Sequence, residues 1–215
     1  MHFPFVCSII AYMEDERILT ILEKLHGLSK TGINYAPDQY NIDRYAEIKK
    51  CVEELYKFVP NFKDTIISTP DEDGYITPKV GMSAVIENEN GELLLELRAD
   101  NEMWGLPGGW AELGSSPEQN IIREVKEETG LNVEVKSLLE VQHRIPHKDY
   151  PFTTYLLLYH CEVISGEISI SHESLDIAWK HINSINNWYA DHGTWLFNLK
   201  ENTYAKNNLK YIQSI

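Results

Sequence analysis

The sequence predicts an α/β fold with a mixed sheet, preceded by a small α-helical domain. Three observations lead to this prediction. Apolar residues recur at helical spacing in residues 15 to 60, whereas strand-like apolar runs alternate with helical segments in the rest of the chain. An Asn-Gly turn separates two of these runs, which is the strongest short signal for a β-hairpin. Strands interspersed with separated helices favour a sheet with helices packed on its faces.

Two amphipathic helices are expected in the N-terminal part. The first covers residues 15 to 30 and is ended by Gly32. The second can be capped by Asn41 or Asp43 and is closed by Pro60. Two helices of this size cannot bury their apolar stripes on each other alone, so the stripes must also pack on the rest of the chain or on a partner subunit. The stripes comprise Ile18, Leu19, Leu22, Leu25 and Leu28 in the first helix and Tyr45, Ile48, Val52, Leu55 and Val59 in the second.

Residues 61 to 76 are interpreted as a linker between two domains, residues 1–70 and 71–215. The second domain begins with the hairpin, whose turn lies at residues 88 to 92. A short helix follows, and beyond it three strands and a C-terminal helix are expected. The strands fall at residues 132–143, 152–164 and 175–182, and the helix runs from about 187 to 204.

The short central helix carries the most informative residues of the chain. The run REVKEETGL makes Glu124, Glu127 and Glu128 neighbours, because helical residues three and four apart meet on one face. Carboxylates side by side repel one another unless something positive lies among them. Oxygen ligands of this kind suit hard divalent cations such as Mg²⁺ or Mn²⁺. A solvated acidic face is the alternative interpretation.

The ends of this helix are predicted as well. Ser115 or Ser116 can be its N-cap, with Pro117 in the first turn and Glu or Gln at the third position to complete a capping box. Gly130 supplies the left-handed residue that ends the helix. The preceding run GLPGG, residues 105 to 109, allows its backbone to approach a ligand closely because little side chain intervenes.

These residues resemble the signature of the Nudix hydrolases, a Gly, a Glu and the run Arg-Glu-aliphatic-x-Glu-Glu-x-Gly-aliphatic at fixed spacing. The signature has its first Glu at the position of Ser115, so the family's contact that holds Arg123 and the loop before it has no matching residue here. The resemblance implies an α/β/α sandwich that hydrolyses nucleoside diphosphates linked to another moiety. The matching positions are Gly109, Arg123, Glu124, Val125, Glu127, Glu128, Gly130 and Leu131.

The resemblance implies a metal site on the central helix. Glu127 and Glu128 are the expected ligands, and Gly109 is among the metal-binding positions. Glu124 is either a further ligand or the general base. The implied cofactor is Mg²⁺ or Mn²⁺, which neutralises phosphoryl oxygens and lowers the pKa of bound water.

The general base can instead come from another loop. Glu173 is ranked above Asp176, and both can equally be surface acids. Arg123 stands four residues before Glu127, so it can pair with a carboxylate and hold the loop before the helix. The role expected for Arg123 is structural before it is catalytic, and we count it with the catalytic residues through this pairing.

Three residues are predicted to bind substrate, and Arg98 and Trp110 are two of them. Arg98 ends a strand and can clamp a phosphate, although it can also pair with Asp100 or Glu102. Trp110 and Trp104 flank the Gly-rich loop and can stack on a base, although aromatic residues at such positions are more often part of the core.

Arg144 is the third, in the only basic patch of an acidic chain. The patch also contains His143, His147 and Lys148, and a solvated loop is the alternative interpretation. The formal net charge of −14 argues against a stable nucleic-acid complex or binding to an acidic membrane, since polyanions are normally bound by basic surfaces.

The chain also resembles a Nudix subgroup with an N-terminal helical domain, which includes CDP-choline pyrophosphatases. This implies a pyrophosphatase acting on CDP-choline or a similar compound, with a homodimer formed through the N-terminal helices. ADP-ribose or nucleotide-sugar pyrophosphatase is the alternative within the enzyme class. A catalytically weak metabolite sensor or scaffold would explain Ser115 but would not need Glu124, Glu127 and Glu128.

A reduced, cytoplasmic location is expected. Cys7, Cys51 and Cys161 are odd in number and far apart, and no C-x-x-C pair suggests a zinc or redox site. The first thirteen residues have no basic leader or small-residue cleavage site, so we expect no signal peptide.

Overall fold

The structure is a computed structural model that describes residues 4–59, 76–146 and 152–210. It contains two compact units. The first consists of residues 1–79 with 143–154, and the second of residues 80–142 with 155–215. The predicted domain boundary at residue 70, nearly all of the linker, and His147 and Lys148 lie outside the described residues.

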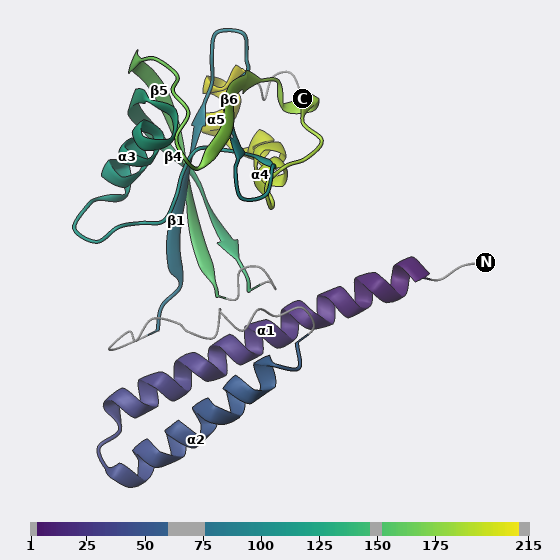
Figure 1. Ribbon diagram of the computed structural model, residues 1–215, viewed down its shortest axis with the longest axis vertical. Helices are drawn as coiled ribbons and strands as arrows, with labels where there is room; N and C mark the ends of the chain where they lie inside the picture. The colour runs from purple at the N-terminus through teal and green to yellow at the C-terminus, as the bar shows by residue number, and fades with distance from the viewer. Residues whose placement is uncertain (1–3, 60–75, 147–151, 211–215) are drawn as a thin grey trace. The chain divides into compact units, whose positions relative to one another are not determined.

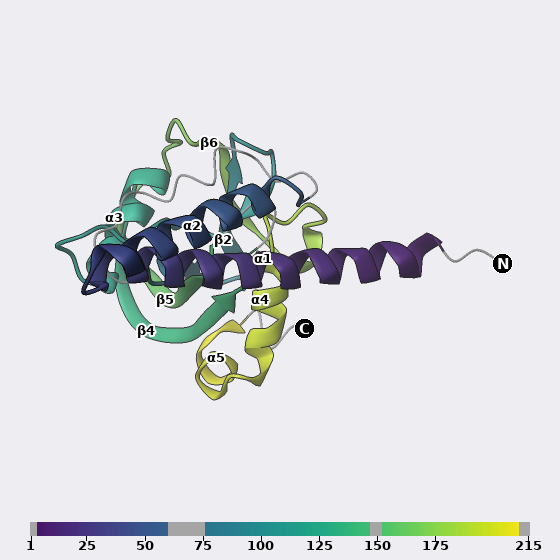
Figure 2. The same ribbon diagram turned by 90° about the horizontal axis from the view of Figure 1, so that it is seen from below.

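The first unit contains two helices that lie side by side, α1 (Pro4–Tyr35) and α2 (Gln39–Tyr56) (Figures 1 and 2). Their shared core comprises Leu19, Leu22, Val52, Tyr56 and Val59. No helix in the described part of the chain has the length and apolar content needed to cross a bilayer.

Three predictions about these helices are wrong. α1 begins at Pro4 rather than at residue 15. α1 does not end at Gly32 but continues to Tyr35, because Gly32 serves close packing. A Cβ atom at Gly32 would lie 2.3 Å from Cδ1 of Tyr45 in α2. The cap of α2 is Asp38, whose carboxylate accepts a hydrogen bond from the amide of Asn41 at 2.9 Å. Asn41 and Asp43, the caps expected from the sequence, lie inside the helix.

The second unit contains two three-stranded sheets. One has the strand order β1-β5-β4 and the other the order β3-β2-β6. The strands are β1 (Lys79–Ile86), β2 (Leu93–Arg98), β3 (Trp104–Gly105), β4 (Leu131–Arg144), β5 (Thr154–Gly166) and β6 (Ser174–Lys180).

The predicted hairpin is only partly correct. Its turn forms where expected, with the Asn88 amide donating to the Glu92 carbonyl at 3.0 Å and Gly91 at φ 76°. The strands on either side then separate into different sheets, after a single antiparallel bridge between Glu87 and Leu93. A turn motif fixes the reversal of the chain, but the partners of each strand are chosen by residues far away in sequence.

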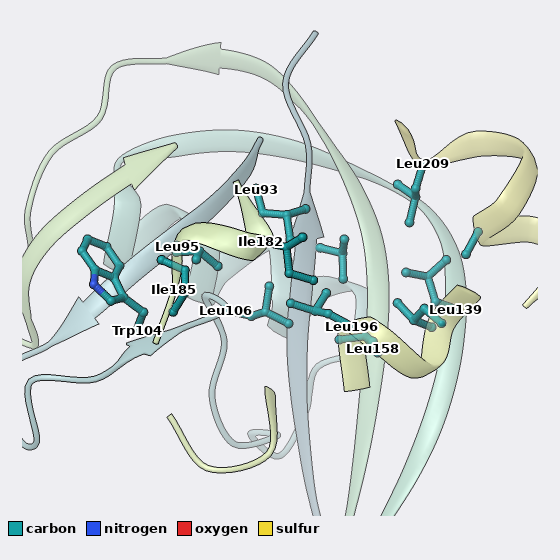
Figure 3. Close-up of a cluster of buried hydrophobic side chains, with 13 residues drawn as sticks. Leu93, Leu95, Trp104, Leu106, Leu139, Leu158, Ile182, Ile185, Leu196 and Leu209 are labelled. Atoms are coloured by element: carbon teal, nitrogen blue, oxygen red, sulfur yellow. The ribbon is translucent and has the colours of Figure 1, made fainter. Parts of the chain in front are cut away.

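Helices cover both faces of this β structure, which gives the expected α/β/α sandwich (Figure 1). α3 (Pro117–Thr129) packs through Ile121 and Val125 on one apolar cluster, which also contains Leu94. A second cluster lies on the opposite side, where Leu196 and Leu199 belong to the C-terminal segments (Figure 3). Because β2 contributes residues to both clusters, successive side chains of this strand face opposite layers.

The single C-terminal helix predicted at 187–204 is wrong. The segment forms α4 (His192–Asn198), a 3₁₀ turn (Leu199–Glu201) and α5 (Thr203–Asn208). Its first residues pair with β3 instead, since the Tyr189 amide donates to the Trp104 carbonyl at 2.7 Å. Asn202 separates the later pieces by capping α5 with its side chain.

Candidate active site

The ends of α3 are set by local residues. The hydroxyl of Ser116 accepts a hydrogen bond from the Gln119 amide, and the Gln119 side chain accepts one from the Ser116 amide. This reciprocal pair is the predicted capping box, with Ser116 as the cap rather than Ser115. Pro117 opens the helix, and Gly130 ends it at φ 77°.

The three carboxylates of α3 lie in different environments. Glu124 and Glu128 are one turn apart, and Glu128 is only 5% exposed. Glu127 lies on the solvent side, where 58% of its side chain is exposed. The site therefore has an inner pair of carboxylates and an outer one.

The Gly-rich loop packs directly against the inner pair. The Gly108 amide donates a hydrogen bond to Oε2 of Glu128 at 2.8 Å. Gly108 has φ 151°, and a Cβ atom there would lie 2.1 Å from the Met82 carbonyl oxygen. A Cβ atom at Gly109 would lie 2.6 Å from Oε1 of Glu124. Glycine is therefore required at position 108 beside the Met82 backbone, and glycine at position 109 leaves the Glu124 carboxylate undisplaced.

Glu96 on β2 belongs to the same group of charges, and it was not identified from the sequence. It is 1% exposed and accepts a hydrogen bond from the Ser174 hydroxyl at 2.8 Å. Burial raises the pKa of Glu96. Burial also raises the pKa of Glu128, and the charge of Glu96 raises it further, followed by those of Glu124 and Glu173. The alternation of LLLELR was the available signal, because it puts Glu96 on the same face as buried Leu94.

Glu173 lies in the loop before β6, and its backbone is fixed. Its amide donates to the Ser171 hydroxyl at 3.1 Å, and its carbonyl accepts from the Ala99 amide at 2.8 Å. Its charge raises the pKa values of both Glu96 and Glu128.

Asp176 faces the other way. It is paired with Leu97 across the strands, whereas Ile177 is paired with Glu96. Directly opposed residues share one face of a sheet, so Asp176 and Glu96 lie on opposite faces. The geometry thus favours Glu173 over Asp176 as a group near the carboxylates.

Arg123 connects the acidic residues with the loop before α3. Its guanidinium lies 2.8 Å from Glu124 and 2.7 Å from Glu127. It also lies 3.4 Å from Glu112, a partner that the sequence analysis did not identify. Desolvation opposes the charge of Arg123, but the neighbouring carboxylates raise its pKa overall.

The three predicted substrate residues lie in different local environments. Arg98 makes two hydrogen bonds to Asp100, each of 3.0 Å, and its guanidinium lies 4.5 Å from the centre of the Tyr189 ring. Trp110 is 45% exposed, whereas Trp104 is buried in the core. Arg144 ends β4 and belongs to the first unit, whereas the carboxylates described above all belong to the second.

The inner pair of carboxylates, together with Glu96, has the chemistry that binds a hard divalent cation. Glu96, Glu124 and Glu128 offer only oxygen ligands, and burial, followed by the charges of neighbouring carboxylates, raises the pKa of each. Within the described residues, no three carboxylate, imidazole or thiol side chains are arranged to hold a metal ion as they stand. Two predicted ligands, Glu124 and Glu127, are paired with Arg123 instead. Arg123 contacts Oε1 of Glu124, so a cation would bind this carboxylate through Oε2 while Arg123 holds its other oxygen.

Comparisons with known proteins agree with this architecture. The NUDIX domain matches residues 77–199. The putative ADP-ribose pyrophosphatase YjhB of Bacillus subtilis is 32% identical over 150 residues, which cover 67% of this chain and 71% of that protein. The ADP-ribose pyrophosphatase of Methanocaldococcus jannaschii is 34% identical over 121 residues, 55% of this chain and 70% of that protein.

A solved structure supports the fold. The crystal structure of a UDP-X diphosphatase has a TM-score of 0.52 and 21% identity, and the match covers 87% of this chain and 95% of that one. The predicted α/β/α fold preceded by N-terminal helices is confirmed by this likeness and by the order of helices and strands along the chain. Because the NUDIX domain covers more than half of the sequence, the chain belongs to the Nudix family and is a Nudix hydrolase.

Proposed function

We propose that this Nudix hydrolase cleaves the pyrophosphate bond of a nucleoside diphosphate linked to a second group, with Mg²⁺ or Mn²⁺ as cofactor. The observation that carries the proposal is the packing of Glu124 and Glu128 against the Gly-rich loop, with Glu96 buried beside them. Such a cluster of desolvated carboxylates is unfavourable without a positive charge and provides the ligands that a hard cation requires.

Glu124 and Glu128 are the proposed principal ligands. When bound, the cation would neutralise phosphoryl charge and lower the pKa of a water molecule. Glu127 is exposed and paired with Arg123, so we place it at the outer edge of the site. Arg123 would hold Glu124 and Glu127 in place before a cation binds.

Glu173 is the proposed general base. It is accessible, with 58% of its side chain exposed, and its backbone is held by Ser171 and Ala99. An exposed carboxylate on a fixed backbone can accept the proton of an attacking water molecule without first being desolvated.

Arg98 and Trp110 are the proposed substrate contacts. Arg98 is close enough to Glu96 for each charge to affect the pKa of the other, and two hydrogen bonds to Asp100 hold its guanidinium. Trp110 follows Gly109 and is 45% exposed as a residue, and its indole can stack on a base. For Arg144, the proposal rests on sequence alone.

ADP-ribose is the first substrate to test, because the relatives with the longest matches described above carry that activity in their names. CDP-choline remains a proposal from the sequence resemblance. Both compounds present the same reacting bond, so the choice between them depends on the groups that Trp110 and Arg98 contact.

A homodimer is also proposed. Ile18, Ile21, Leu25 and Leu28 are exposed on α1 at intervals of three, four and three residues. This is the spacing of a helical seam that packs against another helix. The partner that we propose is a second copy of the chain.

A reduced, cytoplasmic location is also proposed. It is consistent with the free thiol of exposed Cys51.

A substrate screen tests the proposed function. The purified protein is incubated with ADP-ribose, a UDP-sugar, CDP-choline and a dinucleoside polyphosphate, each with Mg²⁺ or Mn²⁺, and the nucleotide products are separated by chromatography. We expect a nucleoside monophosphate and a phosphorylated second product from at least one compound. No turnover above that of Glu128→Gln on every compound would contradict the proposal.

A further inference from the structure

The segment that connects the Gly-rich loop to α3 has few contacts of its own. The side chains of residues 111–119 are all exposed, and Leu113 at the tip is completely so. Apolar burial therefore cannot fix this segment. It nevertheless leads directly into the helix that carries Glu124 and Glu128, so its position affects theirs.

One buried side chain of α3 holds the segment. Asn120 is 1% exposed, although all nine residues before it are exposed. Its Oδ1 accepts a hydrogen bond from the Glu112 amide at 3.2 Å. Its Nδ2 lies 3.3 Å from the carbonyl oxygen of Glu112, 3.5 Å from that of Ser115 and 3.2 Å from that of Ser116. A side chain with both a donor and an acceptor is needed for this set of contacts.

The same Asn120 also contacts Arg123. Nη2 of Arg123 lies 3.4 Å from Oδ1 of Asn120 and 2.8 Å from Oε1 of Glu124. Arg123 further reaches Glu112 at 3.4 Å. A continuous set of polar contacts thus runs from the segment, through Asn120 and Arg123, to the carboxylate of Glu124.

Helix stability does not explain an Asn at this position. Ala would be the better helix former by roughly half a kcal/mol or more, and it would not bury a polar amide. Position 115 has only the short side chain of serine. The contact between Ser115 and Asn120 is made by the backbone carbonyl oxygen of Ser115. The Nudix signature has a Glu at position 115, for which the resemblance implies a contact with Arg123, and here Asn120 contacts Arg123 from inside the helix.

We propose that Asn120 is a positioning residue that replaces the missing Glu at position 115. It fixes residues 112–116 and, together with Glu112, orients Arg123 against Glu124. The catalytic part of this inference rests on the proposed function, because it assumes that the placement of Glu124 matters for cation binding and turnover. The structural part concerns the free protein and does not depend on any substrate.

The experiment compares the wild type with Asn120→Ala, Asn120→Ser, Ser115→Glu and the double variant Asn120→Ala with Ser115→Glu. Asn120→Ser keeps a polar group that can reach the Ser116 carbonyl of its own helix but is too short for Glu112 and Ser115. Asn132→Ala is the matched control, because Asn132 donates to Ser165 at 2.8 Å in another part of the same unit. Each protein is examined by hydrogen exchange without metal, by Mn²⁺ titration and by steady-state kinetics.

We expect Asn120→Ala and Asn120→Ser to increase hydrogen exchange at residues 112–116 about tenfold or more, whereas Asn132→Ala leaves it unchanged. Mn²⁺ binding and kcat should each fall about tenfold, with KM changed less. Ser115→Glu alone should change kcat no more than about twofold. The same substitution should restore most of the loss in the Asn120→Ala background, because the new carboxylate can again hold Arg123.

Unchanged exchange at residues 112–116 in both Asn120 variants would overturn the inference. So would a failure of Ser115→Glu to restore Mn²⁺ binding, since the two positions would then not share one task. If no substrate is turned over by the wild type, the proposed function fails, but the exchange and Mn²⁺ measurements still decide the role of Asn120. If Asn120→Ala does not fold, Asn120→Ser supplies the same comparison.

Discussion

The carboxylates of α3 show what sequence reasoning can reach at the scale of single residues. Helical spacing was sufficient to group Glu124, Glu127 and Glu128, because that spacing is a local property. It could not show that Glu128 is buried and Glu127 exposed, since burial depends on the packing of α3 on the sheet. Glu96 was missed for the same reason, because its hydrogen-bond partner Ser174 is on another strand.

The buried carboxylate of Glu128 should make the metal-free protein less stable at higher pH. Burial and the charge of Glu96 raise its pKa above the ordinary value of 4.5. A group with a raised native pKa stabilises the protein below its unfolded pKa, and this contribution is lost as pH rises through the native pKa. We expect the melting temperature in the presence of a chelator to fall between mildly acidic and alkaline pH, and Glu128→Gln to flatten this dependence. A steeper dependence in Glu128→Gln would contradict this.

Glu173 and Asp176 provide a matched pair for finding the general base. Glu173→Gln should lower kcat by about a hundredfold or more, because a positioned base contributes about that much. Asp176→Asn should stay within about threefold of the wild type, since Asp176 lies on the opposite face of β6 from Glu96. An equal fall in kcat in the two variants would contradict the assignment of Glu173 as the general base.

At the scale of elements, local sequence signals predicted the ends of helices and the position of a turn. They did not predict which strands pair with one another. The capping box at Ser116 and the stop at Gly130 follow from neighbouring residues, and both appear in the structure. The strands beside the Asn-Gly turn separate into different sheets, and residues near 188 pair with β3 instead of forming a helix. Such choices depend on residues far apart in sequence, which a local pattern cannot specify.

The closeness of the Gly-rich loop to α3 can be tested with one methyl group. A Cβ atom at Gly109 would lie 2.6 Å from Oε1 of Glu124, the end of a flexible side chain that can move away. We expect Gly109→Ala to fold normally but to lose about tenfold to a hundredfold in kcat/KM, because it displaces a proposed ligand. The control is Gly105→Ala, where the nearest atom would lie 3.4 Å away. Full activity in Gly109→Ala, measured beside this control, would mean that the position of Glu124 is unimportant.

At the scale of the whole molecule, the two units present different problems for prediction. The amphipathic pattern of the N-terminal helices was clear, but only Leu19 and Leu22 of the first predicted stripe are buried, and Ile18, Leu25 and Leu28 remain exposed. The sequence could show that apolar residues recur, but not which of them meet α2. The proposal of a homodimer follows from the apolar residues of α1 that do not pack on α2 and remain exposed.

Sedimentation equilibrium tests this dimer. The wild type should sediment as a dimer at micromolar concentration, and the double variant Ile21→Ser with Leu25→Ser should sediment as a monomer, because the exposed seam would be interrupted. Tyr40→Ser is the control, since Tyr40 is an exposed aromatic residue of α2 outside this seam. A wild type that is monomeric at that concentration would exclude the proposed interface.

The central claim is that the inner carboxylates of α3 bind the cation used in pyrophosphate hydrolysis, and kcat/KM tests it most directly. It is measured for the wild type, Glu124→Gln, Glu128→Gln and the control Glu134→Gln on the best substrate of the screen, over a range of Mg²⁺ and Mn²⁺ concentrations. Glu134 is an exposed residue of β4 that pairs with Lys136. We expect both α3 variants to lose about a thousandfold while remaining folded, and Glu134→Gln to match the wild type. Activity within about tenfold of the wild type in both α3 variants would contradict the account.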